Sequence, residues 1–213
     1  MLKTFSALCA VAMTCSVLGA PAARATPATE AFIQQSFDKG YVILNTASLS
    51  ASERGEQFRS LLLGLTASRR IALFTLGPYA AAASPADVDA FTEAFTNYSI
   101  AVYEKGLKRY DGQTLKVTGS SDRSTDDSVV QTEIVSPSKA PPIRVSFRVR
   151  RDENGAPIVT DIQIEGVSLA MTERADFTAY LQQHNGSIPE LARSLGAMSD
   201  KLAGKVETRP AIY

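Results

Sequence analysis

The residue types that support acid–base or nucleophilic catalysis are few and far apart in this 213-residue chain. The single histidine, His184, stands at the predicted end of a helix, where positive charge is favoured, so we expect a cap or surface residue. Ser168 lies in Gly-Val-Ser-Leu without the Gly-x-Ser-x-Gly pattern of a nucleophile elbow. We therefore expect Ser168 to form a turn, and we predict no catalytic residue.

The carboxylates also fit structural roles better than catalytic ones. Asp161 and Glu165 are four residues apart in a predicted strand, so both project from its charged face, away from a closed pocket. We expect them to be solvated cross-strand partners of Arg148 and Arg150. The Ser- and Asp-rich run 120–128 has the composition of a loop, and it lacks the pattern of an ordered calcium loop. No metal site is predicted.

The N-terminus has the pattern of a secretory signal peptide. Lys3 precedes an apolar run over 7–18, and Ala23-Arg24-Ala25 supplies the small residues of a cleavage site, so we expect cleavage after Ala25. An uncleaved anchor is the alternative, but the run is shorter than the roughly 20 residues that span a bilayer. Cys9 and Cys15 both lie in this segment. The mature chain would therefore have no disulfide and no thiolate chemistry.

Charge and length narrow the class of protein further. Removing Lys3 and Arg24 from the 22 basic residues leaves 20, against 22 acidic residues. This slightly acidic balance argues against a nucleic-acid partner. A mature chain over 26–213 is predicted to be a single domain with a substantial core. Export would place it outside the cytoplasm.

Apolar periodicity predicts helices in the first half of the mature chain and at its end. Ser50 with Glu53 forms a capping box, and Ser84-Pro85 is a strong helix start that should open a long helix rich in aromatic residues. Ser187 with Glu190 predicts a further capping box. The expected helices cover 29–46, 50–65, 69–76, 84–110, 172–184 (capped by Thr172) and 187–202.

Between the helices the period changes to two, which is typical of strands. Four strands are predicted near 115–117, 130–134, 143–149 and 160–164, with a hairpin turn at 152–155. Short links between them predict an antiparallel meander with one apolar and one charged face. The fold class is therefore α+β: a curved sheet of about four strands, with a helical half over 27–111, strands over 114–169 and C-terminal helices over 172–204.

The apolar side chains of the aromatic helix 84–110 and of the concave sheet face are expected to face each other. A curved sheet folded against helices can leave an open apolar interior, and such cavities are common ligand sites. The alternative is that the same side chains simply fill a core. The candidate lining residues are Leu73, Phe91, Phe95, Tyr98, Val102, Val145, Phe147, Val149, Ile162, Ile164 and Leu169.

Three blocks of sequence carry a resemblance to a known family. They are 73–95, with a Leu-Gly-x-Tyr turn before the Ser-Pro-capped helix; 98–112, ending in Tyr-Asp-Gly; and 159–177, with Glu-Gly-Val-Ser-Leu followed by Arg174 and Phe177. In these blocks the chain resembles the MlaC family of periplasmic phospholipid-binding proteins, one branch of which is associated with hopanoid biosynthesis. It departs from the family pattern at Ile158, at Glu173 and in the alanine run 80–83, where the family commonly has an aromatic, a tyrosine and a basic residue.

The resemblance implies an NTF2-like fold and a lipid carrier without a cofactor. Such a carrier encloses the acyl chains of a phospholipid or related membrane lipid and leaves the head group outside. Its implied partners are an inner-membrane ABC transporter complex and an outer-membrane lipoprotein complex. Two other functions stay open on the sequence. One is an enzyme on the same scaffold, which would need an inward carboxylate or histidine; the other is an envelope interaction protein with a filled core.

Overall fold

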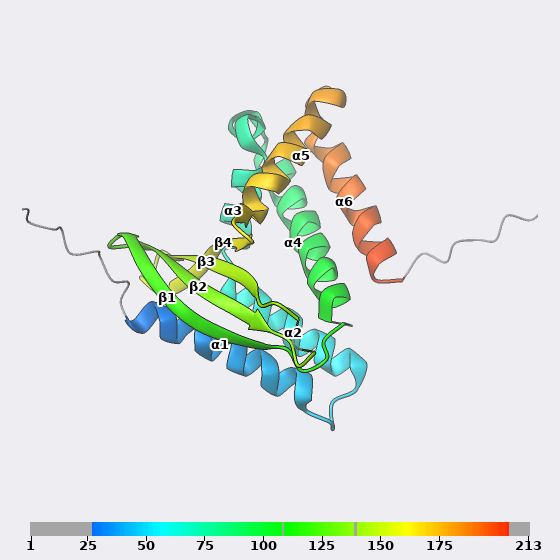
Figure 1. The fold of residues 1–213 in the computed structure, drawn as a ribbon. Coiled ribbons are helices and arrows are strands. Elements are labelled where there is room, and N and C mark those ends of the chain that lie inside the picture. The colour runs from blue at the N-terminus through cyan, green and yellow to red at the C-terminus, as the bar shows by residue number, and fades with distance from the viewer. Residues whose placement is uncertain (1–26, 108, 139, 205–213) are drawn as a thin grey trace, which may run out of the picture.

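The computed structural model describes residues 27–107, 109–138 and 140–204 (Figure 1). The predicted signal peptide, with Cys9 and Cys15, lies outside these ranges. None of the helices in the described ranges combines the length and the apolar character needed to cross a membrane. The elements are α1 (Pro27–Asn45), α2 (Ala51–Leu65), α3 (Ser68–Thr75), the 3-10 helix η1 (Gly77–Ala82), α4 (Pro85–Leu107), β1 (Thr114–Ser124), β2 (Asp127–Val135), β3 (Ile143–Arg151), β4 (Pro157–Ile164), β5 (Val167–Ser168), α5 (Leu169–Gln183) and α6 (Ile188–Leu202).

The strands form one antiparallel sheet in the order β1-β2-β3-β4-β5, so the α+β class and the meander are confirmed. The hairpin between β3 and β4 turns at Gly155, which has a φ of 79°. A fifth, two-residue strand follows β4 through a tight turn. Glu165 and Gly166 both have positive φ there, at 48° and 83°, a conformation that glycine adopts without steric cost.

The prediction of a loop over 120–128 is wrong. β1 continues to Ser124 and β2 begins at Asp127, so only a tight turn separates them. The polar side chains of this run pair across the hairpin: the Ser128 hydroxyl donates to Asp122 Oδ1 at 2.5 Å. Composition suggested a loop because serine and aspartate are common in turns. Here they hold two paired strands together.

Most predicted helix starts are confirmed, and one is wrong. Ser50 forms the expected capping box with Glu53, and the Ser84 hydroxyl accepts from the N–H of Asp87 at 3.1 Å. The start of α5 differs from the prediction. Its N-cap is Ser168 and not Thr172, and the Ser168 hydroxyl accepts from the N–H of Met171 at 3.1 Å. Ser168 has extended backbone, as an N-cap requires, whereas Thr172 already lies within the helix.

The buried apolar residues form two separate clusters, one between the sheet and α1 and one among α3, α4, α5 and α6, and Figure 1 shows these two groups of elements. The sheet core lies between one face of the sheet and α1, which runs beneath it; it contains Ile33, Leu115, Val130, Val145, Phe147, Val149 and Val159. The helical core lies among α3, α4, α5 and α6 and contains Ala72, Leu76, Phe91, Phe95, Phe177, Leu181, Ile188, Leu191 and Leu195. The expectation that helix 84–110 covers the apolar sheet face is therefore wrong. Helix α1 covers it, and α4 packs mainly against α6.

Candidate functional site

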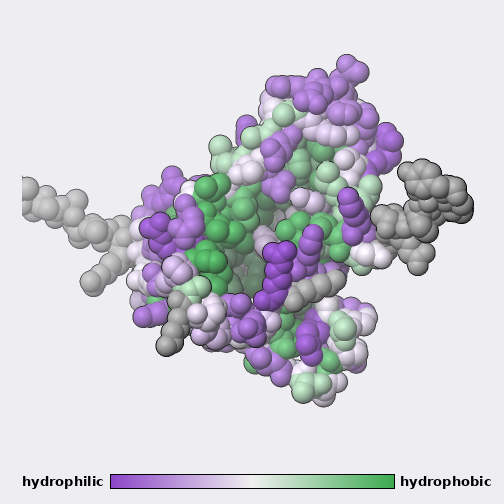
Figure 2. All heavy atoms as spheres, turned by 45° about the vertical axis from the view of Figure 1, so that its right-hand side comes forward, coloured by the Kyte–Doolittle hydropathy of each residue, from purple (hydrophilic) through white to green (hydrophobic). Residues whose placement is uncertain are grey.

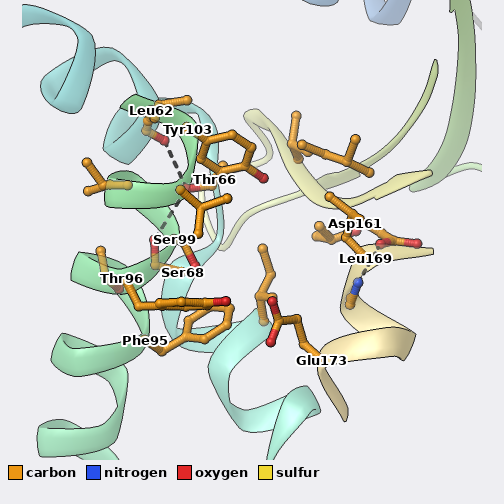
Figure 3. Close-up of a pocket in the computed structure, with 18 of the residues that line it drawn as sticks. Leu62, Thr66, Ser68, Phe95, Thr96, Ser99, Tyr103, Asp161, Leu169 and Glu173 are labelled. Atoms are coloured by element: carbon orange, nitrogen blue, oxygen red, sulfur yellow. Dashed lines mark hydrogen bonds between the residues drawn. The ribbon is translucent and has the colours of Figure 1, made fainter. Parts of the chain in front are cut away.

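A cavity of about 180 Å³ lies at the seam between the two cores. Side chains from α2, α3, α4, β4 and α5 and from the α2–α3 connection form its wall (Figure 3). Phe95 contributes from the helical core, and Val159 contributes from the sheet core. The space exists because neither core extends across the junction of sheet and helices.

The edge of β4 determines where the cavity lies. β5 pairs only with Gln163 and Ile164, so the first half of β4 has no strand on that side. The connection between α2 and α3 docks there instead: Thr66 forms a parallel bridge with Val159, and the N–H of Ala67 donates to Val159 O at 3.1 Å. This short contact spaces the helices from the sheet edge without filling the gap.

Five of the eleven candidate lining residues lie at this cavity: Phe95, Tyr98, Val102, Ile162 and Leu169. Leu62 and Ile71, which the sequence did not single out, join them. At the rim, Leu63 and Val102 are 43% and 42% exposed, so apolar surface continues to the mouth. In Figure 2 hydrophobic residues gather around a hollow on this face of the molecule. The wall is thus mainly apolar and open to solvent at one side.

The other six candidates lie elsewhere. Val145, Phe147 and Val149 are buried in the sheet core, where the rings of Phe147 and Phe37 are in edge contact at 5.4 Å. Phe91 is fully buried in the helical core. Leu73 is half-buried on α3 outside the cavity wall, and Ile164 is 42% exposed. Strand alternation identified the apolar sheet face correctly, but α1 occupies that face. The lipid-binding role of all eleven residues stays a prediction.

A bulge in β4 changes which side chains point where. Val149 pairs with Val159 and Arg148 pairs with Asp161, which leaves Thr160 as the extra residue. Val159 and Ile162 therefore share the face toward α1, and strict alternation fails. Asp161 lies directly opposite Arg148 in the sheet, as predicted, but the prediction that its side chain is solvated on the charged face is wrong. Asp161 is half-buried at the cavity wall, and its Oδ1 accepts from the N–H of Ala170 at 3.1 Å.

The arginines of β3 form ion pairs with carboxylates other than Asp161. Glu165 is exposed, as expected, but its partner is Arg144, at 2.9 Å. Arg148 donates two hydrogen bonds to Asp127, the shorter at 2.5 Å, and Arg150 lies 4.0 Å from the same carboxylate. Hydrogen bonds from Arg148 hold the pKa of Asp127 below its usual range. This charged cluster lies at the sheet and has no part in the cavity.

Three side chains of the cavity wall have shifted pKa values: Tyr98 and Tyr103 on α4, and Glu173 on α5. Burial raises the pKa of Tyr103 to about 12, and the charge of Glu173 adds to that effect. Burial, with a smaller contribution from Asp176, raises the pKa of Glu173. Burial also raises the pKa of Tyr98, and the negative charge of Glu173 makes a smaller contribution. The sequence offered one signal for this group, the departure from the family pattern at Glu173.

Ser168 and His184 lie at the two ends of α5. Ser168 caps α5, and His184 ends it, with its ring stacked on Tyr180 at 3.8 Å and its Nδ1 2.8 Å from Tyr180 O. Across the described residues, no three His, Cys, Asp or Glu side chains are grouped so as to hold a metal ion.

The chain was compared with protein-family models and with solved structures. The family model described as MlaC protein matches residues 34–197. The chain belongs to the MlaC family. Its fold is also similar to a solved structure, the phospholipid-binding protein from Ralstonia solanacearum in complex with a phospholipid, with a TM-score of 0.71 over 82% of this chain and 98% of that chain. At 19% sequence identity, this likeness shows a shared fold. The MlaC-family chain described here thus combines that fold with its own cavity wall.

Proposed function

We propose that this MlaC-family protein is a periplasmic lipid carrier that encloses acyl chain in the seam cavity. The observation that carries the proposal is an apolar cavity between two otherwise well-packed cores, with an apolar rim at Leu63 and Val102 that is open to solvent. The phospholipid bound by the Ralstonia protein of the same fold supports it. The predicted signal peptide supports the location.

A carrier of this kind solves a solvation problem. A lipid with two long tails has roughly 30 methylenes, and each costs about 0.8 kcal/mol to expose to water. Free diffusion across an aqueous compartment is therefore negligible, and a protein that covers the tails removes that barrier. The tails need only an apolar surface of sufficient length. A wall built from Leu62, Ile71, Phe95 and Ile162 meets that need without a catalytic group.

The cavity must widen to take a whole lipid. Its volume, about 180 Å³, is below the roughly 300–1,000 Å³ of common ligand sites. Helix α2 is the element best suited to move, because none of its residues is buried while Leu62 and Leu63 line the cavity. Outward displacement of α2 would lengthen the space between α4 and the sheet edge and would disrupt neither core.

We propose further that the carrier exchanges lipid with an inner-membrane ABC transporter complex and an outer-membrane lipoprotein complex, as its family membership suggests. The apolar rim is the natural exit for a lipid tail. Energy from ATP would be used by the transporter, because the carrier itself needs only to open and close.

The decisive experiment is lipid analysis of the mature chain, residues 26–213. Organic extracts of purified protein are examined by mass spectrometry, and lipid-free protein is incubated with vesicles and reisolated. We expect close to one lipid per protein in both cases. Repeated absence of lipid, natively and after incubation, would overturn the carrier function and favour an interaction protein with a filled core. The small volume of the cavity gives that second function its physical basis.

A further inference from the structure

Of the two cavity carboxylates, Glu173 is the one that accepts no hydrogen bond from the part of the chain that the structure describes. Its carboxylate points into the space between α5 and α4 in Figure 3, and Tyr103 projects from α4 into the other end of that space. Asp161, the other carboxylate at the wall, accepts the N–H of Ala170 at 3.1 Å. Among the described residues, none donates a hydrogen bond to Glu173 or pairs with the hydroxyls of Tyr98 and Tyr103. All three side chains are half-buried in a mainly apolar wall, so their polar atoms remain available to a hydrogen-bonding group on a ligand.

The surroundings contain no cation to compensate Glu173. Within the described residues, the wall has two carboxylates and no Lys, Arg or His. The neighbouring Arg174 points away, because its guanidinium donates to Phe74 O at 3.3 Å and lies 4.9 Å from the centre of the Phe74 ring. Asp176, on the same helix, adds a further negative charge. The described cavity wall is therefore negative on α5 and β4, and α4 contributes hydroxyl groups from Thr96, Tyr98, Ser99 and Tyr103 and no cation.

From this arrangement we propose that Glu173 makes the carrier selective for lipids that present a hydrogen-bond donor at the cavity, an ammonium or a hydroxyl, and that carry no net negative charge there. The inference rests on the proposed carrier function and specifies the substrate class of the same site. A donor on the ligand would form a charge-assisted hydrogen bond with Glu173, the strong kind. The hydroxyls of Tyr98 and Tyr103 would serve the ligand's remaining polar atoms. An anionic group would instead meet a like charge, and the described cavity wall has no cation to offset the repulsion.

The test uses the mature chain and vesicles that differ only in head group, with identical acyl chains. Phosphatidylethanolamine presents an ammonium donor, diacylglycerol presents a hydroxyl, phosphatidylcholine is zwitterionic without a donor, and phosphatidylglycerol is anionic. Captured lipid is quantified by mass spectrometry after competition between pairs. We expect phosphatidylethanolamine and diacylglycerol to exceed phosphatidylcholine by about tenfold, the factor that 1.4 kcal/mol produces, and phosphatidylglycerol to be captured least.

Glu173→Gln removes the charge and retains an acceptor oxygen. We expect this variant to raise capture of phosphatidylglycerol, relative to phosphatidylcholine, about tenfold. Glu153→Gln is the matched control, because it makes the same chemical change at an exposed residue in the β3–β4 turn, away from the cavity wall, and should leave the order unchanged. Thermal unfolding verifies that both variants are folded.

The outcomes separate the two proposals. Equal capture of all four lipids by the wild type, a preference for phosphatidylglycerol, or an unchanged order in Glu173→Gln overturns the selectivity and leaves the carrier function standing. No capture of any lipid by the wild type overturns the carrier function, and the selectivity with it.

Discussion

The sheet core and the seam cavity are both lined by apolar side chains, but only those of the sheet core are covered by another element. In the sheet core, α1 lies along the sheet, and Val145, Phe147 and Val149 are only 4–6% exposed. At the seam, Leu63 and Val102 remain 43% and 42% exposed around an open space. The chain covers one sheet face with its own helix and leaves the edge of β4 to a short loop contact. An open apolar cavity thus arises where the two cores meet without merging.

Buried charge differs between the regions in the same way. Asp127, at the sheet, receives hydrogen bonds from Arg148, and its pKa is lowered. Glu173, at the seam, lacks such a donor among the described residues, and burial raises its pKa. The sheet region satisfies its polar groups internally, as a structural core must. The seam leaves polar and apolar groups available to a ligand.

The largest change in stability is expected from a substitution that damages the sheet core alone. Phe147→Ala removes a 6%-exposed aromatic ring that contacts Phe37, so we expect a loss of about 3–5 kcal/mol of unfolding free energy from the cavity it creates. Chemical denaturation of lipid-free protein measures the loss. Lipid captured per folded molecule should stay close to wild type. A variant of normal stability with poor lipid capture would place Phe147 in the binding site and contradict the separation of the regions.

The Asp127 cluster tests whether the sheet region depends on its internal charge pairs. Asp127→Asn leaves Arg148 without its carboxylate partner, and we expect a loss of about 2 kcal/mol, less than for a fully buried pair because Arg148 is 31% exposed.

The same cluster predicts a pH dependence. Because the folded-state pKa of Asp127 is lowered, its contribution is complete above its unfolded pKa of about 4 and is lost as pH falls through the folded value. Unfolding curves should show wild type losing this increment in acid and Asp127→Asn lacking it. Parallel pH profiles for the two proteins would be the contrary result.

The rim of the cavity should affect binding and leave stability nearly unchanged. Val102→Trp adds bulk at an exposed position on the mouth, so we expect lipid capture to fall about tenfold, equivalent to about 1.4 kcal/mol. The change in unfolding free energy should stay within about 0.5 kcal/mol, as for other surface substitutions. Met198→Trp on α6, at a position 49% exposed, is the matched control and should capture lipid normally. Equal effects of the two substitutions would argue against entry at this rim.

The smallest expected effect has the opposite sign to the others. Tyr103→Phe removes a cavity hydroxyl that no described residue satisfies, so lipid-free protein should be unchanged or more stable by up to about 1 kcal/mol. Thermal unfolding of lipid-free protein measures it. A loss of more than 1 kcal/mol would mean that the hydroxyl is part of a structural network and that the seam is as well satisfied as the sheet core.

Local patterns allowed much of the fold to be predicted. Side-chain caps such as Ser50 with Glu53 act over three residues, so a capping box can be identified without tertiary information. Alternation in β3 identified Val145, Phe147 and Val149 as one buried face for the same reason. The error at Thr172 arose within this local range, since two hydroxyl residues four positions apart both suit an N-cap and only Ser168 has the extended backbone.

The candidate site was less accessible from the sequence. The bulge at Thr160 places Val159 and Ile162 on one face, and no alternation pattern can include a residue that the partner strand leaves unpaired. The role of α1 was also hidden, because its apolar stripe fits either the sheet or another helix. The residues on α4 were predicted more successfully, with Phe95, Tyr98 and Val102 at the cavity, because helical periodicity identifies one face whichever partner it meets.

By itself, the sequence determined the elements, their caps, the antiparallel meander and the membership of the MlaC family, since these depend on short-range hydrogen bonding and on side-chain periodicity. Only the tertiary structure decided which apolar face is filled and which stays open. That choice depends on α1, which covers the sheet, and on the contact of Ala67 with Val159, which holds α2 and α3 at the free edge of β4. Both are contacts between segments distant in sequence, and the cavity with Glu173 at its wall results from them.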